Sequence, residues 1–271
     1  MELTQVQIGT LNRALYPFER LGLFRAPCLP DTDLAGAHRN QLLAAILSSD
    51  TPSWQKQLER VDLPQGELLH EQGQLLSHAY FPISAVASLQ CVTRDGHSVE
   101  IAVVGRDGFV GLPLLMSSLA TSYSAIVQSA GQAYRISAQA MMHAFNRSDR
   151  VRHVLLQYSE SVMAQTAQTA ICNRHHSLRQ QLCRRLLRGL DRVGTDQLTI
   201  THEAIAGMLG VRREGVTEAA GFLLDAGLIR YRRGHITILD RAGLEQQSCE
   251  CYAADKAAYQ RLSLTELRHR Q

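Results

Sequence analysis

Hydrophobic and polar positions alternate over short runs in the first half of the chain. From Leu63 to Ile136, runs rich in β-branched and aromatic residues stand between turn signals such as Asp95-Gly96. Runs this short and this closely spaced are typical of antiparallel β structure, and they predict a sandwich or roll of about eight strands. Ahead of it, only Leu43–Leu47 and the segment around Trp54–Leu58 have helical spacing. The clearest runs are AVASLQCV (85–92), SVEIAVVG (98–105), YSAIVQS (123–129) and QAYRIS (132–137).

A different spacing begins after Ser137, where the pattern predicts helix. From Val151 to Cys172 a stripe of side chains recurs at alternating steps of four and three residues, which is the spacing of a helix that packs along a partner helix. A seam between two copies of the chain and a stripe that covers the roll fit this spacing equally well. Polar residues within the stripe favour the dimer seam. The predicted dimer interface is Val151, Leu155, Tyr158, Val162, Gln165 and Thr169.

The segment Thr201–Leu224 has the pattern of two short helices joined by a tight turn. A helix-turn-helix needs one residue that tolerates positive φ and another that lets the two backbones approach closely. Gly210 and Ala206 meet these needs, and Thr201 is the predicted N-cap of the first helix, with Glu203 in its first turn. The interior positions are apolar at helical spacing: Ile205, Leu209, Val211, Val216 and Ala219.

The second of these helices is predicted to begin near Arg212. Its N-terminal half is the part that meets base edges in the major groove of DNA, where arginine can pair with guanine and glutamate can accept from cytosine. An isolated pattern of this kind also occurs in helical hairpins with a charged, solvated face. The predicted base contacts are Arg212, Arg213, Glu214, Thr217 and Glu218.

The residues that follow favour DNA binding over a plain hairpin. Asp225-Ala226-Gly227 ends the helix, and LIRY, the turn RRGH and ITIL predict a two-stranded wing. From Ser177 to Arg241 there are eleven arginines against seven acidic residues, a surplus of four in a chain whose total charge is +3. Basic character concentrated at such a motif indicates nucleic-acid binding. The predicted phosphate contacts are Thr201, Arg230, Arg232, Arg233 and His235.

Length and composition place the chain among two-domain proteins, because 271 residues with 45% hydrophobic content suffice for two compact cores. No apolar run is long enough to span a bilayer, and the start MELTQVQIGT lacks the basic residues and apolar core of a signal peptide. We therefore expect a cytoplasmic protein.

The six cysteines predict neither a disulfide framework nor a cofactor or metal site. An iron–sulfur cluster usually takes about four clustered cysteines, and the N-terminal region offers only Cys28. Cys249 and Cys251 have a spacing that could join a metal site, but no nearby histidine completes a tetrahedral set. Packing or an inert thiol is the preferred interpretation. His175-His176 is predicted to cap a helix or to bond between domains, with a pH-sensitive hinge or a haem ligand as alternatives.

The sequence argues against an enzyme, because GxSxG, HExxH and Walker A patterns are absent from it. Gly105, Gly108 and Gly111 lie between predicted strands and do not open a helix, which favours turns over a phosphate-binding loop. A third class, a module that binds another regulator and not DNA, would make the basic wing dispensable.

The predicted order of parts resembles that of the Crp/Fnr family of bacterial transcription regulators: a roll, then a long helix, then a winged helix-turn-helix. The resemblance covers nearly all of the chain. It implies an α+β fold with an N-terminal antiparallel, cyclic-nucleotide-binding-like β-roll, a long dimerisation helix and a C-terminal winged helix-turn-helix. The residues that carry it are Tyr80-Phe81-Pro82, Asp95-Gly96, GRDGFVGL (105–112), CNRHH (172–176), THEAIAGMLGVRREGVTEAAG (201–221) and RYRRGHITILDRAGLE (230–245), followed by CECY (249–252).

The resemblance also implies a homodimer that binds a two-fold symmetric promoter site, with half-sites about 34 Å apart, and that contacts RNA polymerase. Its base-contacting positions fall on Arg213, Glu214 and Glu218; the best-known members usually have Arg or another donor at the last, so the DNA site should differ from theirs. The implied domains are an N-terminal extension (1–36), the sensor roll (37–148), the dimerisation helix (149–174), the DNA-binding domain (175–252) and a C-terminal tail (253–271).

The resemblance is weakest at the nucleotide pocket. Nucleotide-binding members place Glu directly after the glycine of the phosphate-binding cassette and Arg before a Ser-Ala pair, whereas here Leu112 follows Gly111 and Tyr123 precedes Ser124. A cyclic phosphate without the arginine loses a charge-assisted contact, so no cAMP binding is expected. Arg106 or Arg135 in a rearranged pocket is an alternative. The predicted degenerate pocket is Gly111, Leu112, Tyr123 and Ser124.

The effector and the choice between activation and repression stay open, because a binding scaffold does not fix its ligand. Cyclic di-GMP, a haem-bound gas and no ligand are all compatible with the sequence. The alternative function is an effector or redox sensor, or a protein-interaction module, with only non-specific DNA affinity.

Overall fold

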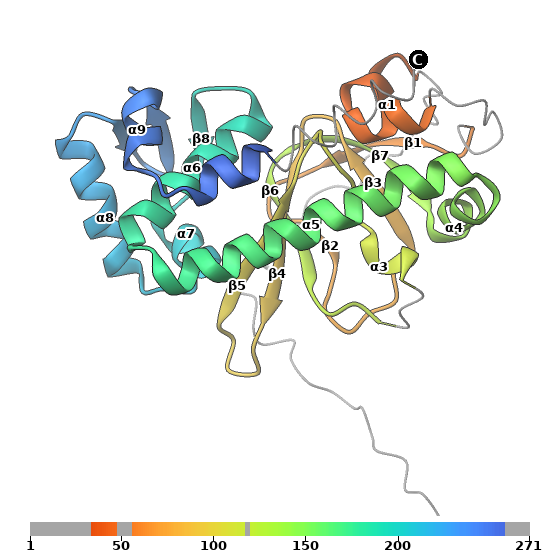
Figure 1. Cartoon of the computed structure of the whole chain (residues 1–271), viewed down its shortest axis with the longest axis horizontal. Helices are drawn as coiled ribbons and strands as arrows, with labels where there is room; N and C mark the ends of the chain where they lie inside the picture. The colour runs from red at the N-terminus through yellow and green to blue at the C-terminus, as the bar shows by residue number, and fades with distance from the viewer. Residues whose placement is uncertain (1–33, 48–55, 117–119, 258–271) are drawn as a thin grey trace, which may run out of the picture.

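Two antiparallel sheets form the sensor roll in the computed structural model, which describes residues 34–47, 56–116 and 120–257 (Figure 1). One sheet has the strand order β1-β7-β3 and the other β2-β6-β4-β5. The predicted antiparallel roll is confirmed, with seven strands in its described part. The strands are β1 (Glu59–Leu63), β2 (Leu68–His70), β3 (His78–Pro82), β4 (Val86–Val92), β5 (Ser98–Val104), β6 (Ser124–Ser129) and β7 (Gly131–Ser137).

A short helical segment closes one end of the roll. It consists of a 3-10 turn, η1 (Leu34–Arg39), and helix α1 (Gln41–Leu47). Asn40 between them accepts from the Leu43 amide and donates to the carbonyls of Pro82 and Gly108, so one buried side chain ties α1 to the roll. The predicted helix around Trp54–Leu58 begins outside the described residues, and its described part is a turn leading into β1. Most of the N-terminal extension also lies outside them.

Three helices follow the strands or interrupt them. Helix α3 (Leu112–Leu115) lies between β5 and β6, and α4 (Ala138–Arg147) follows β7. Ser148 then ends α4 and caps the long helix α5 (Asp149–His175), its hydroxyl accepting from the Val151 amide. Within the described ranges, none of the helices combines the length and the apolar character needed to cross a lipid bilayer.

Helix α5 packs lengthwise across its own roll (Figure 1). Val151, Leu155 and Tyr158 are buried in the core with Phe81 and Phe109, and Val162 packs at the edge of the same core. The dimer-seam prediction is therefore wrong for Val151, Leu155 and Tyr158, because a heptad spacing reports lengthwise packing and not the identity of the partner. For the half-buried Val162 it stays a prediction.

The two polar residues of the stripe also bond within the chain. The Gln165 side chain accepts from the Val103 amide at 2.9 Å, and Thr169 is buried and accepts from Arg184. Gln165 thereby satisfies a backbone group on β5, the edge strand of its sheet, where an unpaired amide would otherwise remain. This bond explains a polar side chain in the stripe without a dimer seam. The correction therefore extends to the buried Thr169, while the half-buried Gln165 stays a predicted interface residue.

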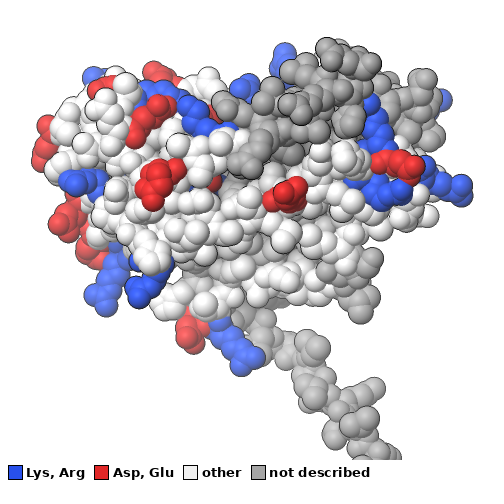
Figure 2. Space-filling view, in the orientation of Figure 1, with Lys and Arg blue, Asp and Glu red and all other residues white. Residues whose placement is uncertain are grey.

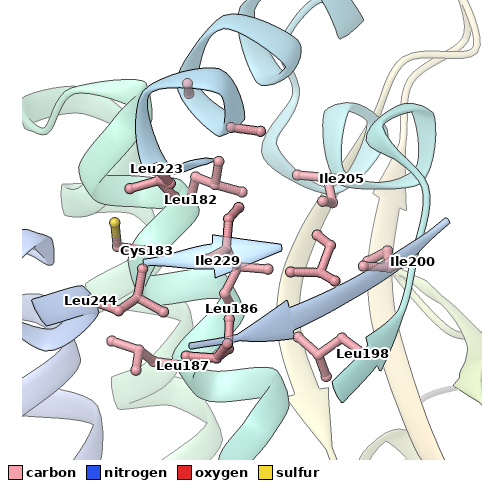
Figure 3. Close-up of a cluster of buried hydrophobic side chains, with 14 of the residues drawn as sticks. Leu182, Cys183, Leu186, Leu187, Leu198, Ile200, Ile205, Leu223, Ile229 and Leu244 are labelled. Atoms are coloured by element: carbon pink, nitrogen blue, oxygen red, sulfur yellow. The ribbon is translucent and has the colours of Figure 1, made fainter. Parts of the chain in front are cut away.

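The predicted DNA-binding domain is built around helix α6 (Leu178–Val193), which begins with a capping box between Ser177 and Gln180. Its leucines enter one core with residues of every following element (Figure 3). These elements are β8 (Gln197–Thr199), α7 (His202–Leu209), α8 (Arg213–Asp225), β9 (Ile229–Arg232), β10 (His235–Ile238) and α9 (Arg241–Gln247).

The opposite face of α6 carries a row of buried arginines with acidic partners. Arg185 pairs with Glu100 of β5 at 3.1 Å. Asp255, in a stretch predicted to belong to the tail, lies in a further helical segment, residues 251–257, and pairs with two members of the row. The row consists of Arg184, Arg185, Arg188 and Arg192, each less than a tenth exposed, so α6 joins the DNA-binding domain to the roll through charges removed from water.

Contact between α5 and the roll depends on the absence of a side chain at residue 108. A Cβ on Gly108 would lie 2.2 Å from Cε2 of Tyr158, whose hydroxyl donates to the Phe109 carbonyl at 3.2 Å. Gly108→Ala is therefore expected to lower the free energy of unfolding in urea by about 1–3 kcal/mol, the usual cost of overpacking.

The same substitution elsewhere provides the control. A Cβ on Gly221, in α8, would meet no atom within 4 Å. Gly221→Ala is expected to raise the free energy of unfolding by up to about 1 kcal/mol, because alanine is the better helix former. Equal effects of the two variants would contradict the overpacking argument.

Candidate nucleic-acid interface and sensor pocket

The turn between α7 and α8 has the predicted geometry. Gly210 ends α7 in the left-handed conformation with φ of 67°, and the Val211 amide donates to the Ala206 carbonyl at 3.0 Å. Thr201 caps α7 by accepting from the Ala204 amide, as predicted. Gly210 meets a second need, because a Cβ there would lie 2.5 Å from the Val99 side chain on β5.

Helix α8 presents its N-terminal half to solvent. Arg212 is its N-cap, and the inward side chains of Val216 and Ala219 hold the helix on the core. The Thr217 hydroxyl bonds within the protein, to the Arg213 carbonyl and to the His202 ring, so this residue also joins α7 to α8. All five predicted base-contact residues are exposed on this one helix start: Arg212, Arg213, Glu214, Thr217 and Glu218.

His202 is part of this surface, although the sequence analysis did not single it out. Its ring stacks on Tyr231 of β9 with centroids 4.2 Å apart, and its Nδ1 lies 3.1 Å from the Thr217 hydroxyl. Partial burial, and then the positive charge of Arg213, lowers the pKa of His202. The ring therefore connects α7, α8 and the wing. One indication in the sequence that His202 lies on this surface is its position directly after the N-cap Thr201.

Strands β9 and β10 form the predicted wing. Their turn has Arg233 at φ 47° and Gly234 at φ 81°, the two positive values of a type I′ hairpin. Strand β8 pairs with β10 and extends the wing to a three-stranded sheet. The predicted phosphate-contact residues are all exposed: Thr201, Arg230, Arg232, Arg233 and His235.

The local arginine surplus has two different origins. Four of the eleven arginines between Ser177 and Arg241 are the buried row on α6, which faces the roll. The exposed arginines at the motif are those of the α8 start and the wing. A count of charges along the sequence could not separate the buried arginines from the exposed ones. Both groups have the spacing that is typical of a solvent-exposed face of a helix or strand.

The residues of the predicted degenerate pocket pack within the roll. Gly111, with φ of 143°, starts α3, and Leu112 after it is buried. Tyr123 packs edge-on against the buried His70 with ring centroids 5.5 Å apart, and the Ser124 hydroxyl accepts from the Gln72 amide. The family resemblance places the charged groups of nucleotide-binding members at the positions of Leu112 and Tyr123.

Neither alternative arginine lies in this group. Arg135 pairs with Glu59 at 2.6 Å on the other sheet of the roll. Arg106 lines a cavity of about 220 Å³ together with Arg188 and Arg192 of α6, and the residues that line this cavity do not include Leu112 or Tyr123.

Comparison with known proteins identifies both domains. Residues 60–148 match the cyclic nucleotide-binding domain, and residues 180–247 match the Crp-like helix-turn-helix domain. The global nitrogen regulator of Synechococcus elongatus is 23% identical over 220 residues, which cover 78% of this chain and 98% of that protein.

Solved structures have the same fold. FixK2 from Bradyrhizobium japonicum superposes with a TM-score of 0.62 at 13% identity, over 71% of this chain and 98% of its own. A Crp/Fnr-family transcriptional regulator from Thermus thermophilus superposes with a TM-score of 0.58 at 22% identity, over 70% of this chain and 98% of its own. With a cyclic nucleotide-binding domain followed by a Crp-like helix-turn-helix domain, the chain is a Crp/Fnr-type DNA-binding transcription regulator.

Proposed function

We propose that the protein binds a two-fold symmetric DNA site as a homodimer, with the start of α8 reading bases and the wing contacting phosphates. The observation that carries this proposal is the exposed α8 start, where two arginines and two glutamates stand on a helix that its inward side chains hold in place. Contact with RNA polymerase, which the family resemblance implies, belongs to the same proposal.

The face of α5 that points away from the roll supports a homodimer. Leu156, Met163 and Ile171 are exposed by 51, 66 and 50% and recur at about two-turn spacing on this face. Figure 2 shows few charged side chains where α5 crosses the molecule, and Glu160 is the one charged residue between Arg152 and Arg174. An uncharged helical stripe of this kind suits a second copy of the same helix.

Substitution within this stripe tests the dimer. Met163→Glu is expected to convert the dimer to a monomer in mass photometry, because each interface would bury two unpaired carboxylates across its two-fold axis. It should also abolish binding to a symmetric site while the roll stays folded. Leu75→Glu, at an apolar residue of the roll with 73% exposure, is the control and should stay dimeric. A Met163→Glu variant that remains dimeric would refute the interface.

We also propose that the roll does not bind cAMP. This part is supported by the buried Leu112 and by the packing of Tyr123 on His70, because both fill positions where a charged partner for ribose or phosphate would be needed. Isothermal titration with cAMP is the test, and no heat of binding is expected. Saturable, stoichiometric binding would contradict it.

The base-reading proposal is tested by selecting bound sequences from random duplex DNA at a stated salt concentration. The wild type is expected to enrich a two-fold symmetric motif. Arg213→Ala should relax the preference at one base pair in each half-site, a loss of about 1–3 kcal/mol of discrimination. Arg147→Ala, at an exposed arginine on α4, should leave the motif unchanged. Enrichment without any motif would favour the alternative of non-specific association.

A further inference from the structure

Three cysteines and one histidine converge where α5 ends and the chain after α9 returns to it. One ligand atom from each of Cys172, His176, Cys249 and Cys251 lies within 4.8 Å of all the others. The three sulfurs are buried together. The expectation that no histidine lies near the Cys-x-Cys pair was wrong, because His176 is 75 residues away in sequence and beside Cys251 in space.

The spacing of these atoms suits a single tetrahedral ion. The Sγ atoms of Cys172 and Cys249 are 3.6 Å apart, and the Sγ of Cys251 lies 3.4 Å from His176 Nδ1. Zinc at about 2.3 Å from sulfur and about 2.0 Å from nitrogen requires donors about 3.5–3.8 Å apart in a tetrahedron. The donor atoms are thus close to coordination distances, and all four are too close together to surround a multi-iron cluster.

The surroundings supply the contacts that orient metal ligands. His176 Nε2 lies 3.1 Å from a carboxylate oxygen of Glu250, the carboxylate–histidine arrangement that fixes the other ring nitrogen as a ligand. The Gln168 amide donates to the Cys251 sulfur at 2.9 Å. Arg184, buried beside Cys172, contributes a positive charge, which offsets the negative charge left when three thiolates bind one divalent ion.

We propose that Cys172, His176, Cys249 and Cys251 form a structural Zn²⁺ site. Three soft thiolates and one imidazole select zinc over oxygen-preferring cations such as Mg²⁺ or Ca²⁺. Four protein donors leave no open position for a substrate, which is the pattern of a structural site. The thiols lose their protons to solvent when the ion binds, and no oxidation state changes.

The site joins the junction of the two domains to the segment that follows α9. Cys172 lies in the last turn of α5, and His176 is the C-cap directly before α6. Cys249 and Cys251 follow α9, just ahead of Asp255, which pairs with the arginine row. A bound ion would therefore fix the direction in which α6 leaves α5, and with it the position of the DNA-binding domain.

The test uses the full chain purified under reducing conditions without chelator. Elemental analysis is expected to find zinc in equal molar amount to the chain. After zinc removal, cobalt(II) titration should produce the intense visible absorption of a tetrahedral site and a thiolate-to-cobalt charge-transfer band, both of which zinc abolishes. Cys249→Ser should reduce the charge-transfer band and weaken zinc retention at least tenfold, because losing even a hydrogen-bond partner of a ligand typically weakens metal binding by about 10–100-fold.

Two further variants test the ligand assignment independently of Cys249→Ser. Cys91→Ser, at a half-buried thiol of the roll, should retain the full cobalt spectrum. His176→Cys supplies a fourth thiolate, and it should retain the metal with a stronger charge-transfer band even if Cys249→Ser does not fold. A wild-type protein that binds no zinc and forms a Cys172–Cys249 disulfide, or a cobalt spectrum without sulfur ligation, would overturn the proposal.

Discussion

Replacing Glu100 with glutamine is expected to lower the free energy of unfolding by about 3–5 kcal/mol, the cost of leaving a buried charge without its partner. Arg185 and Glu100 are each 4% exposed, and burial lowers the pKa of Arg185 against the opposing influence of Glu100. Glutamine keeps the size of the side chain, removes the charge and replaces one of the two acceptor oxygens with a donor. Arg185 would then retain the Gln128 side chain at 2.6 Å as a neutral partner.

Urea unfolding of the full chain measures this effect, and an exposed ion pair provides the comparison. Glu59→Gln removes the partner of Arg135 at a pair whose side chains are 52 and 31% exposed. Its expected cost is no more than about 1 kcal/mol, because water solvates both charges and screens their attraction. Similar losses in the two variants would show that burial does not strengthen the Arg185 contact.

The second large effect is a dependence of stability on pH that comes from His70. Burial lowers the pKa of this histidine to about 4 in the folded protein, against about 6.5 in the unfolded chain. The unfolded state therefore takes up the proton first as the pH falls. The free energy of unfolding is expected to fall by about 3 kcal/mol between pH 6.5 and pH 4 on account of this residue alone.

Unfolding curves at a series of pH values separate His70 from the other histidines. The ring is buried against Tyr123, and its Nε2 has no hydrogen-bond partner among the described residues. His70→Gln cannot titrate and should remove most of the slope below pH 6.5, whatever its effect on absolute stability. His97→Gln, at an exposed residue of the β4–β5 turn, should keep the slope. A slope that survives His70→Gln would contradict the assignment.

Local rules predicted the helix-turn-helix well. Gly210 and Thr201 act through backbone conformation and capping within a few residues, so their roles can be recognised from the sequence alone. The strands of the roll followed from their spacing and their turn glycines for the same reason. Gly210 also contacts Val99, and nothing in the local sequence indicates that contact.

Long-range packing accounts for what could not be predicted. The stripe that begins at Val151 has the spacing of a coiled-coil seam, yet its members as far as Val162 pack on the roll, because such spacing records burial and not which element buries the residues. The arginine row has the charged composition of a solvated face but meets Glu100, Asp107 and Asp255 from distant segments. The sulfur–imidazole cluster requires four residues from two parts of the chain that only the folded structure brings together.

Helix α6 contacts both domains, and this limits which domains of related proteins could replace either of them. One face of the helix belongs to the leucine core of the DNA-binding domain, and the other inserts charged groups into acidic positions on the roll and the C-terminal segment. A chimera that joined this DNA-binding domain to another roll would bury Arg185 and Arg192 without Glu100 and Asp107. The roll and the DNA-binding domain are therefore a matched pair, and a change in the charges of one is expected to require a change in the other.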